Sequence, residues 1–194
     1  MQNPSIKYIL KLSIPIFFAN LAIPLVGIID TGLMGNLGNL SYLSATSVAA
    51  NLFSMIFWSF GFLRMGTVSL VAQQFARKNY NEIILVFVRN IILALFIGIT
   101  IIFFKESILN LIEYFFKTTE ETQNLINKYI SIRILSAPAE LIIYVLAGLY
   151  LGLQRTYISS LMISIFCIGN AALSYVFVIH FNLEIFGVAA GTLI

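Results

Sequence analysis

Three long stretches without a charged residue constrain the fold of this chain more than any other feature. Residues 12–29, 31–63 and 156–183 contain no Asp, Glu, Lys or Arg. An α-helix rises about 1.5 Å per residue and needs about 20 residues to cross the hydrocarbon core of a bilayer. The strands of a membrane β-barrel would instead carry polar residues at every second position. The stretches therefore predict an all-α polytopic membrane protein.

Composition excludes most soluble classes. The chain has 194 residues, of which 60% are hydrophobic and 10% are charged, whereas a soluble domain carries about 25% charged residues. No Gly-x-Ser-x-Gly, His-Glu-x-x-His or Walker sequence is present, so an intramembrane hydrolase or an ATP-driven pump has no recognisable chemistry. Cys167 and His180 each stand alone and predict neither a disulfide nor a metal site. We expect no enzyme activity and no cofactor.

The apolar pattern predicts five spanning helices and the start of a sixth. The expected ranges are 11–32, 43–76, 83–104, 122–152, 157–181 and 186–194. Residues 105–122 mix charged and apolar side chains, which predicts a short helix on the outer membrane surface. The last range is too short to cross a bilayer. We therefore expect the sixth helix to be cut short and the sequence to be a fragment.

The basic residues predict how the chain lies in the membrane. The net charge is +3, but the cations sit singly between apolar runs, which favours the anionic inner lipid surface over nucleic acid as their partner. Alternate connections carry them, namely the N-terminus with Lys7 and Lys11, then Arg77 and Lys78, then Arg155. By the positive-inside rule, the N-terminus is expected to be cytoplasmic and the protein to lie in the inner (plasma) membrane.

Several polar residues are expected at one depth inside the membrane. Counting helical rise from the cytoplasmic ends places them roughly 20 to 30 Å deep. They are Asp30, Arg64, Glu140, Asn170, Ser174 and Thr192. Ionisable groups are costly in hydrocarbon and mark functional sites.

Individual members of this layer suggest different roles. Pro24 precedes Asp30 by six residues and can bend the helix beside an acid that changes its protonation state. Arg64 either lies on a substrate path or pairs with a carboxylate or helix-end carbonyls. The same count puts Arg133 at the outer boundary, which favours an interfacial anchor.

The order of motifs resembles the multidrug and toxic compound extrusion (MATE) family, and within it the DinF-like branch. The resemblance covers the whole chain. It rests on Pro24-x5-Asp30-Thr31 with Gly35-x-x-Gly38, on Phe62-Leu-Arg-Met-Gly-Thr67 with Ala72-Gln73, on Arg133-Ile-x-Ser-Ala-Pro138-Ala with Gly148-x3-Gly152-x-Gln154, and on Asn170 with Gly187-Val-Ala-Ala-Gly-Thr192.

The resemblance implies a transporter of two six-helix lobes, of which this chain is most of the first; the second lobe is absent and would be its partner. Uptake of protons or sodium ions would drive export of small organic, often cationic or drug-like compounds. Prolines such as Pro24 and Pro138 would bend helices.

The resemblance also implies a cation site in this lobe. Its acid matches Asp30, and its Asn and Thr match Asn170 and Thr192, which could together hold sodium. The family's fourth member is an acid, and here it is Ser174. Because that site has lost one negative charge, proton coupling is favoured over sodium.

Three alternatives stay open at the sequence level. A flippase for lipid-linked sugars would keep the architecture but would need several cations in its cavity. A truncated fragment would not transport. Glu140 could replace part of the charge missing at Ser174, as a second proton carrier or as the partner of Arg64, or it could face cavity water or the second lobe.

Overall fold

The computed structural model describes residues 6–37, 40–116 and 118–193, and within these ranges the chain is helical apart from short links. Five segments are long and apolar enough to cross a membrane. They are Ser13–Gly35, Leu40–Ala76, Tyr80–Phe103, Glu120–Gly152 and Thr156–His180. This is the all-α membrane architecture that the charge-free stretches predict.

The helices follow one another along the chain with short connections. Their bounds are α1 Ile6–Gly35, α2 Leu40–Ser59, α3 Gly61–Ala76, α4 Tyr80–Phe103, α5 Lys105–Phe115, α6 Glu120–Arg133, a 3-10 turn Ile134–Ser136, α7 Ala137–Gly152, α8 Thr156–Tyr175, a π-helical segment Val176–His180 and α9 Glu184–Leu193. The short amphipathic segment expected within 105–122 corresponds to α5, which follows α4 directly.

Two of the spans expected as single helices are divided. The range 43–76 is split at Phe60 into α2 and α3, and the range 122–152 is split by the 3-10 turn into α6 and α7. Pro138 lies in the first turn of α7, immediately after that 3-10 turn. Its ring is tolerated there because the first-turn N–H groups of a helix have no intrahelical partner. Pro24, in contrast, lies inside α1, which continues as a helix to Gly35.

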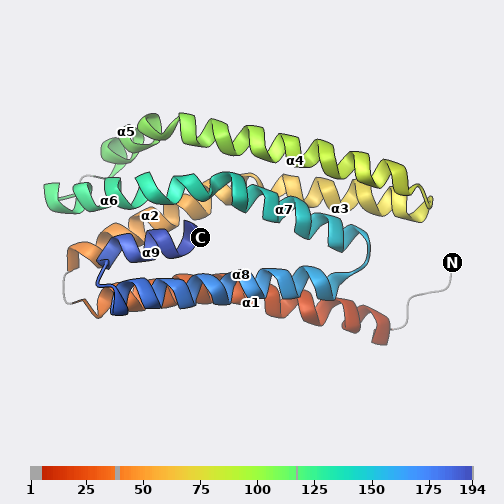
Figure 1. Cartoon of the computed structure of the whole chain (residues 1–194), viewed down its shortest axis with the longest axis horizontal. Coiled ribbons are helices and arrows are strands. Elements are labelled where there is room, and N and C mark those ends of the chain that lie inside the picture. The colour runs from red at the N-terminus through yellow and green to blue at the C-terminus, as the bar shows by residue number, and fades with distance from the viewer. Residues whose placement is uncertain (1–5, 38–39, 117, 194) are drawn as a thin grey trace.

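The helices form a bundle in which successive spans run in opposite directions (Figure 1). The start of α1, the α3–α4 link and the α7–α8 link lie at one end of the bundle, and the end of α1, the end of α5 and the α8–α9 link lie at the other. Helix α1 packs on α8, α7 packs on both α3 and α4, and α2 packs on α6. The three basic segments of the sequence therefore share one end.

A glycine stripe on α7 brings that helix against α3. A Cβ at Gly148 would lie 2.8 Å from the carbonyl oxygen of Arg64, and one at Gly152 would lie 2.7 Å from Cβ of Val71. Only a residue without a side chain permits such an approach, which is the use that small-xxx-small stripes have in membrane bundles. This contact fixes the backbone of Arg64 relative to α7.

Most of the outer surface is apolar. Large hydrophobic side chains such as Trp58, Phe103 and Tyr114 are mostly exposed. The buried core lies where α2, α6 and α7 meet, and it includes Phe53, Ile130 and Leu141. An exposed apolar surface of this extent is expected of a protein that faces lipid.

Candidate functional site

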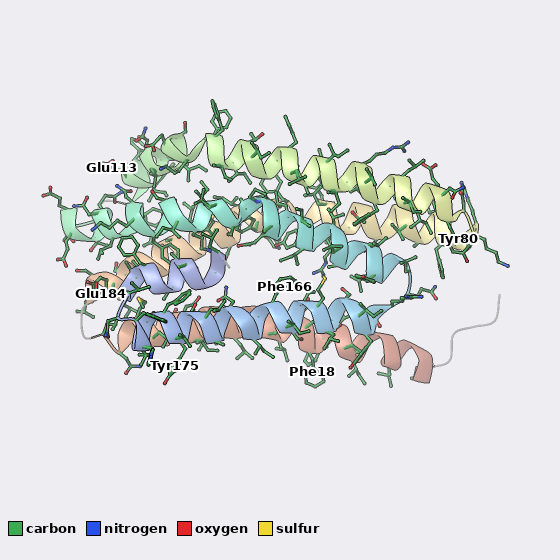
Figure 2. The ribbon with its side chains drawn as sticks, in the orientation of Figure 1. Phe18, Tyr80, Glu113, Phe166, Tyr175 and Glu184 are labelled. Carbon is green, nitrogen blue, oxygen red and sulfur yellow. The ribbon has the colours of Figure 1, made fainter. Side chains whose placement is uncertain are left out.

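A cavity of about 510 Å³ lies inside the bundle and collects residues from seven α-helices. Its polar and charged lining comes from Asp30 on α1, Ser54 on α2, Arg64 on α3, Tyr129 and Arg133 on α6, Glu140 and Tyr144 on α7, Asn170 on α8 and Thr192 on α9, with Ser136 from the 3-10 turn. Phe166 projects from α8 into the space facing α7 (Figure 2). Apolar side chains fill much of the remaining wall, as is usual for sites that take small organic molecules.

The structure brings five of the residues predicted for the polar layer to this cavity. These are Asp30, Arg64, Glu140, Asn170 and Thr192. Ser174 is fully buried behind the cavity, next to Asp30. The helix-bend candidates Pro24 and Pro138 are not part of the wall.

The side of the cavity formed by α1 and α8 holds polar atoms without partners. Oδ1 of Asp30, Oδ1 of Asn170 and Oγ of Ser174 are buried and make no hydrogen bond to any described residue. Thr192 donates its hydroxyl to the carbonyl oxygen of Val188, at 3.0 Å. Buried polar atoms without a partner are rare, because each costs about 1–3 kcal/mol. Of these three unpartnered atoms, the oxygens of Asp30 and Asn170 are suitable ligands for a hard cation such as Na⁺, and the carboxylate of Asp30 can alternatively bind a proton.

Ser174 is held in place by α9. A Cβ at Gly191 would lie 2.7 Å from Oγ of Ser174 and 2.6 Å from its backbone nitrogen. Helix α9 therefore packs directly over Ser174.

The opposite side of the cavity holds a closed ion pair. Nη2 of Arg133 lies 3.1 Å from Oε1 of Glu140, and the two side chains are only 16% and 23% exposed. Ser136 lies between them in sequence, with its Oγ 3.0 Å from the same Glu140 oxygen and 2.7 Å from the carbonyl oxygen of Arg133. The guanidinium also lies over the ring of Phe53, 5.3 Å from its centroid.

This pair corrects two expectations. Arg133 is not an isolated anchor at the outer boundary, because its side chain lines the cavity and binds Glu140. The ion-pair partner of Glu140 is Arg133 and not Arg64. Counting residues along a helix gives the depth of a residue in the membrane but not the direction in which its side chain points.

Arg64 lies one turn after the break at Phe60, near the start of α3. Within the part of the chain that the structure describes, it has no hydrogen bond and no ion pair, although its charge acts on the neighbouring Tyr144. The cavity therefore contains one guanidinium that is neutralised by a carboxylate and one that is not.

Sequence reasoning missed Tyr129. The side chain is 2% exposed, lines the cavity and lies near both Asp30 and Arg133. A signal for it was present, because Tyr129 and Arg133 are four residues apart and so share one face of α6.

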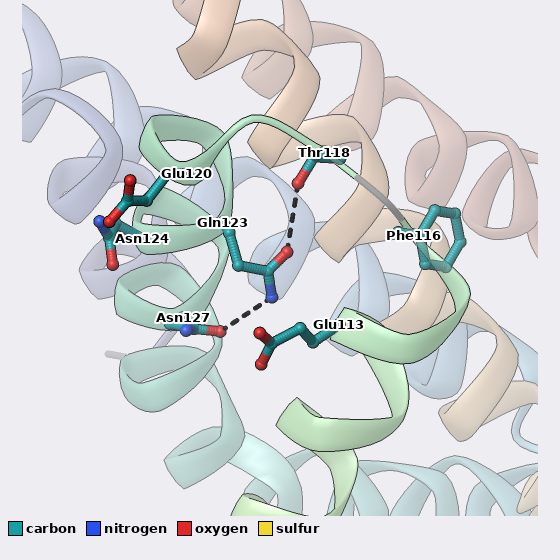
Figure 3. Close-up of a pocket in the computed structure, with 7 residues that line it drawn as sticks. All are labelled: Glu113, Phe116, Thr118, Glu120, Gln123, Asn124 and Asn127. Carbon is teal, nitrogen blue, oxygen red and sulfur yellow. Dashed lines mark hydrogen bonds between the residues drawn. The ribbon is translucent and has the colours of Figure 1, made fainter.

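A second, polar hollow lies between α5 and α6 (Figure 3). Its wall consists of Glu113, Phe116, Thr118, Glu120, Gln123, Asn124 and Asn127. Gln123 bonds to Thr118 at 3.1 Å and to Asn127 at 3.5 Å, so these amide and hydroxyl groups satisfy one another. No cluster of three metal-ligating His, Cys, Asp or Glu side chains occurs among the described residues, and we assign no site to this hollow.

The fold and the cavity together define a multi-pass helical membrane protein with a polar chamber inside one bundle, which is the architecture of a transporter lobe. The family model MatE matches residues 15–176. The chain belongs to the MATE family, whose members are transporters and not enzymes.

Individual relatives agree with this assignment. The chain is 32% identical over 188 residues to DNA damage-inducible protein F of Escherichia coli (strain K12), an alignment that covers 97% of this chain and 41% of that protein. A solved multidrug resistance MATE family transporter of the MOP superfamily, in an outward-facing conformation, superposes with a TM-score of 0.87 at 22% identity. A MOP superfamily transporter from Pyrococcus furiosus Vc1, described as having a binding pocket of reverse polarity, superposes with a TM-score of 0.83 at 23% identity. Each structural match covers 95% of this chain and 41% of the other, so the chain spans less than half the length of these relatives.

Proposed function

We propose that this chain forms the cation-coupled lobe of an antiporter that exports small organic, often cationic, compounds. The observation that supports the proposal best is that Asp30 and Asn170, which line a chamber of about 510 Å³, each hold one buried oxygen without a hydrogen-bond partner. A cation at Asp30 would change the charge of the same chamber that holds the cargo. Export would then be driven by competition between the coupling cation and the cationic cargo for the negative charge of Asp30.

The proton is the preferred coupling ion in this proposal, with sodium as the alternative. A sodium site uses several oxygen ligands, and its affinity for the ion rises with the number of those ligands that are negatively charged. Position 174 contributes a hydroxyl and no second carboxylate. A single acid is sufficient to carry a proton.

The test is Asp30→Asn in inverted membrane vesicles that contain the protein, with ethidium as the organic cation. With an imposed proton gradient, the unaltered protein is expected to accumulate ethidium and the variant to lose this activity, since an amide cannot exchange a proton. The matched control is Glu113→Gln, which removes an acid outside the chamber. Unchanged ethidium uptake by Asp30→Asn would contradict the proposal, and uptake driven by a sodium gradient alone would reverse the choice of ion.

The orientation is part of the proposal. We place the N-terminus in the cytoplasm and the protein in the plasma membrane, because the basic connections share one end of the bundle (Figure 1). A cysteine at Asn81, in a protein whose Cys167 is replaced by serine, should react with an impermeant maleimide only from the cytoplasmic side. One at Asn36 should react only from outside, and the reverse labelling would contradict this orientation.

Two alternatives make different demands. A flippase for lipid-linked sugars is favoured by the presence of Arg64 and Arg133 in one cavity, but Arg133 is already neutralised by Glu140. A chain that does not transport alone is consistent with its covering 41% of its relatives. We propose that a second six-helix lobe completes the transporter; coexpression of the E. coli relative's remaining segment should raise ethidium efflux if this is correct.

A further inference from the structure

Arg64 is a charged side chain of the chamber that has no counter-ion. It lines the chamber from α3, and none of the ion pairs among the described residues includes it. The other guanidinium of the chamber, on Arg133, lies 3.1 Å from Oε1 of Glu140. A cation in a mostly apolar chamber is costly unless an anion accompanies it. Arg64 is therefore the chamber cation for which the described part of the chain provides no anion.

Packing holds the backbone of Arg64 at the chamber wall. Helix α7 approaches so closely that a Cβ at Gly148 would lie 2.8 Å from the carbonyl oxygen of Arg64 and 2.8 Å from Cβ of Thr67. From α4, Nδ2 of Asn90 donates to Oγ1 of Thr67 at 2.9 Å. That hydroxyl in turn donates to the carbonyl oxygen of Leu63 at 2.6 Å. A backbone that is already fixed lowers the entropy cost of binding a ligand through Arg64.

The register of α3 against α7 keeps Arg64 apart from Glu140. Gly148 lies against the carbonyl oxygen of Arg64. One turn later, a Cβ at Gly152 would lie 3.0 Å from the carbonyl oxygen of Val68, so the two helices run in the same direction. Glu140 precedes Gly148 by eight residues, which is about 12 Å along the axis at about 1.5 Å per residue. Side chains lean toward the N-terminus of their own helix, so in two parallel helices this lean does not close the gap.

The charges of the chamber leave one acid and one cation unpaired when no coupling ion is bound. Its charged lining consists of Asp30, Arg64, Arg133 and Glu140. Arg133 and Glu140 neutralise each other, and Oγ of Ser136 lies 3.0 Å from the same carboxylate oxygen. What remains is the carboxylate of Asp30 on α1 and the guanidinium of Arg64 on α3. A ligand with only a basic group is repelled by Arg64, whereas a ligand with a basic group and a carboxylate matches both charges.

The wall near Arg64 suits an aromatic ligand. Tyr144 lines the chamber one turn before Gly148, so it lies on the face of α7 that meets α3. Its phenol can donate one hydrogen bond to a carboxylate. Phe166 enters the chamber from α8 (Figure 2), and aromatic rings pack favourably on one another.

We propose that Arg64 binds the carboxylate of the cargo, so that the chamber takes aromatic compounds that carry both a basic group and a carboxylate. The planar guanidinium can form two parallel N–H···O bonds with one carboxylate. Tyr144 supplies a further donor, and Phe166 packs on the ring of the compound. This inference rests on the proposed function for the basic group, which Asp30 takes, and it adds the carboxylate as a second recognised group.

The experiment compares two dyes that differ in one group. Tetramethylrhodamine has a cationic ring system and a free carboxylate, and its methyl ester has the same ring system with that carboxylate masked. Each dye is titrated by equilibrium dialysis into the purified full chain in lipid nanodiscs, and empty nanodiscs give the binding to lipid. In Arg64→Gln we expect the acid to bind about tenfold more weakly, because it loses a charge-assisted contact. The ester should bind at least as tightly as before, because it loses only a repulsion.

Two further measurements separate recognition from support of the fold. Arg64→Lys should restore part of the affinity for the acid, since it keeps the charge but not the planar fork. Potassium benzoate, which has a carboxylate and a ring but no basic group, needs no substitution at all. In the unaltered protein it should weaken binding of the acid more than binding of the ester, compared with potassium chloride at the same concentration. Equal effects of benzoate and chloride on the acid would overturn the proposal.

The matched control is Arg89→Gln, which removes an arginine from the exposed surface of α4. It should bind both dyes as the unaltered protein does, with circular dichroism confirming the fold of every variant. Equal weakening of the two dyes in Arg64→Gln would mean that Arg64 only supports the fold, and would reject the carboxylate site. Loss of acid binding in Arg133→Gln but not in Arg64→Gln would also reject it.

The same dyes distinguish failure of this site from failure of the proposed function. In Asp30→Asn both dyes should bind more weakly to a similar extent, because both carry the cationic ring system. If Asp30→Asn keeps ethidium transport while Arg64→Gln weakens the acid alone, the proposed function fails and the carboxylate site stands. If Asp30→Asn abolishes transport while Arg64→Gln binds the acid normally, the proposed function stands and the carboxylate site fails.

Discussion

Two arginine–glutamate ion pairs with the same sequence spacing lie in very different surroundings. Arg89 and Glu82 are 3.3 Å apart on α4, with side chains that are 68% and 34% exposed. Arg133 and Glu140 are 3.1 Å apart across the α6–α7 turn, with side chains that are 16% and 23% exposed. The distances hardly differ, so the spacing of charges in a sequence says little about what a pair contributes.

Burial decides the energy of such a pair. An exposed pair contributes roughly 0–1 kcal/mol, because water screens the attraction and ordering two long side chains costs entropy. Removing one partner of a buried pair costs about 3–5 kcal/mol, because the other charge remains in a low-dielectric site. The same Glu→Gln substitution is therefore expected to cost more stability in the buried pair than in the exposed pair. Two variants test this comparison, and two more test the groups around the buried pair.

The largest loss is expected for Glu140→Gln. The amide keeps the shape and can still accept the proton of Ser136, but it leaves the Arg133 guanidinium without an anion. Because both side chains keep some exposure, we expect a loss near the lower end of the buried range, about 3 kcal/mol. The measurement is the free energy of unfolding in detergent micelles. A loss below about 1 kcal/mol would mean that water reaches the guanidinium freely.

Phe53→Leu is expected to cost about 2 kcal/mol. The ring is 1% exposed and carries Arg133 5.3 Å from its centroid, so the variant loses both packing and a cation–π contact. Phe57→Leu is the matched control, because Phe57 stacks on Phe53 with centroids 5.9 Å apart and is 5% exposed. We expect the control to cost about 1 kcal/mol less. Equal losses would show that the guanidinium gains nothing from the ring.

The sequence predicted the spans well because one physical requirement fixes them. A charged residue in hydrocarbon is costly, so charge-free stretches mark helices whatever their packing. The break at Phe60 and the 3-10 turn at Ile134–Ser136 have no such signal. The 3-10 turn has a different signal, because Pro138, which the sequence predicts as a bend, follows it directly and lies in the first turn of α7.

The candidate site was predicted in part for a related reason. Residues four apart, such as Asn170 and Ser174, share a helix face whatever the fold does. The partner of Glu140 depends on the rotation of α6 relative to α7, which changes at the turn between them. Counting residues from the helix ends therefore placed Arg64 and Glu140 at a similar depth. It could not predict that the side chain of Arg133 pairs with Glu140.

Ser136→Ala is expected to cost about 1 kcal/mol. Its hydroxyl lies 3.0 Å from the carboxylate of Glu140, and a hydrogen bond to a charged group contributes about 1.5–3 kcal/mol. Part of that is retained, because Arg133 still holds the same oxygen. The unfolding midpoint should fall, and the fall should vanish in a Glu140→Gln background if the two groups act together. Additive losses would show that Ser136 acts only on the backbone, through the carbonyl oxygen of Arg133.

The smallest loss, below about 0.5 kcal/mol, is expected for Glu82→Gln. Glu82 lies in the first turn of α4, where its backbone N–H bonds to the side chain of Asn79 at 3.3 Å, and this cap is independent of the carboxylate. The acid contributes through its attraction to the helix N-terminus and through Arg89, and salt screens both. Raising the salt concentration from about 0.05 M to 1 M should therefore remove the small difference between Glu82→Gln and the unaltered protein. The same change should leave most of the Glu140→Gln loss in place, because the Debye length shortens in solution but a mostly buried pair is screened much less. If salt removed both losses alike, the Arg133–Glu140 pair would be as accessible to ions as the surface pair, and the contrast between the two would not hold.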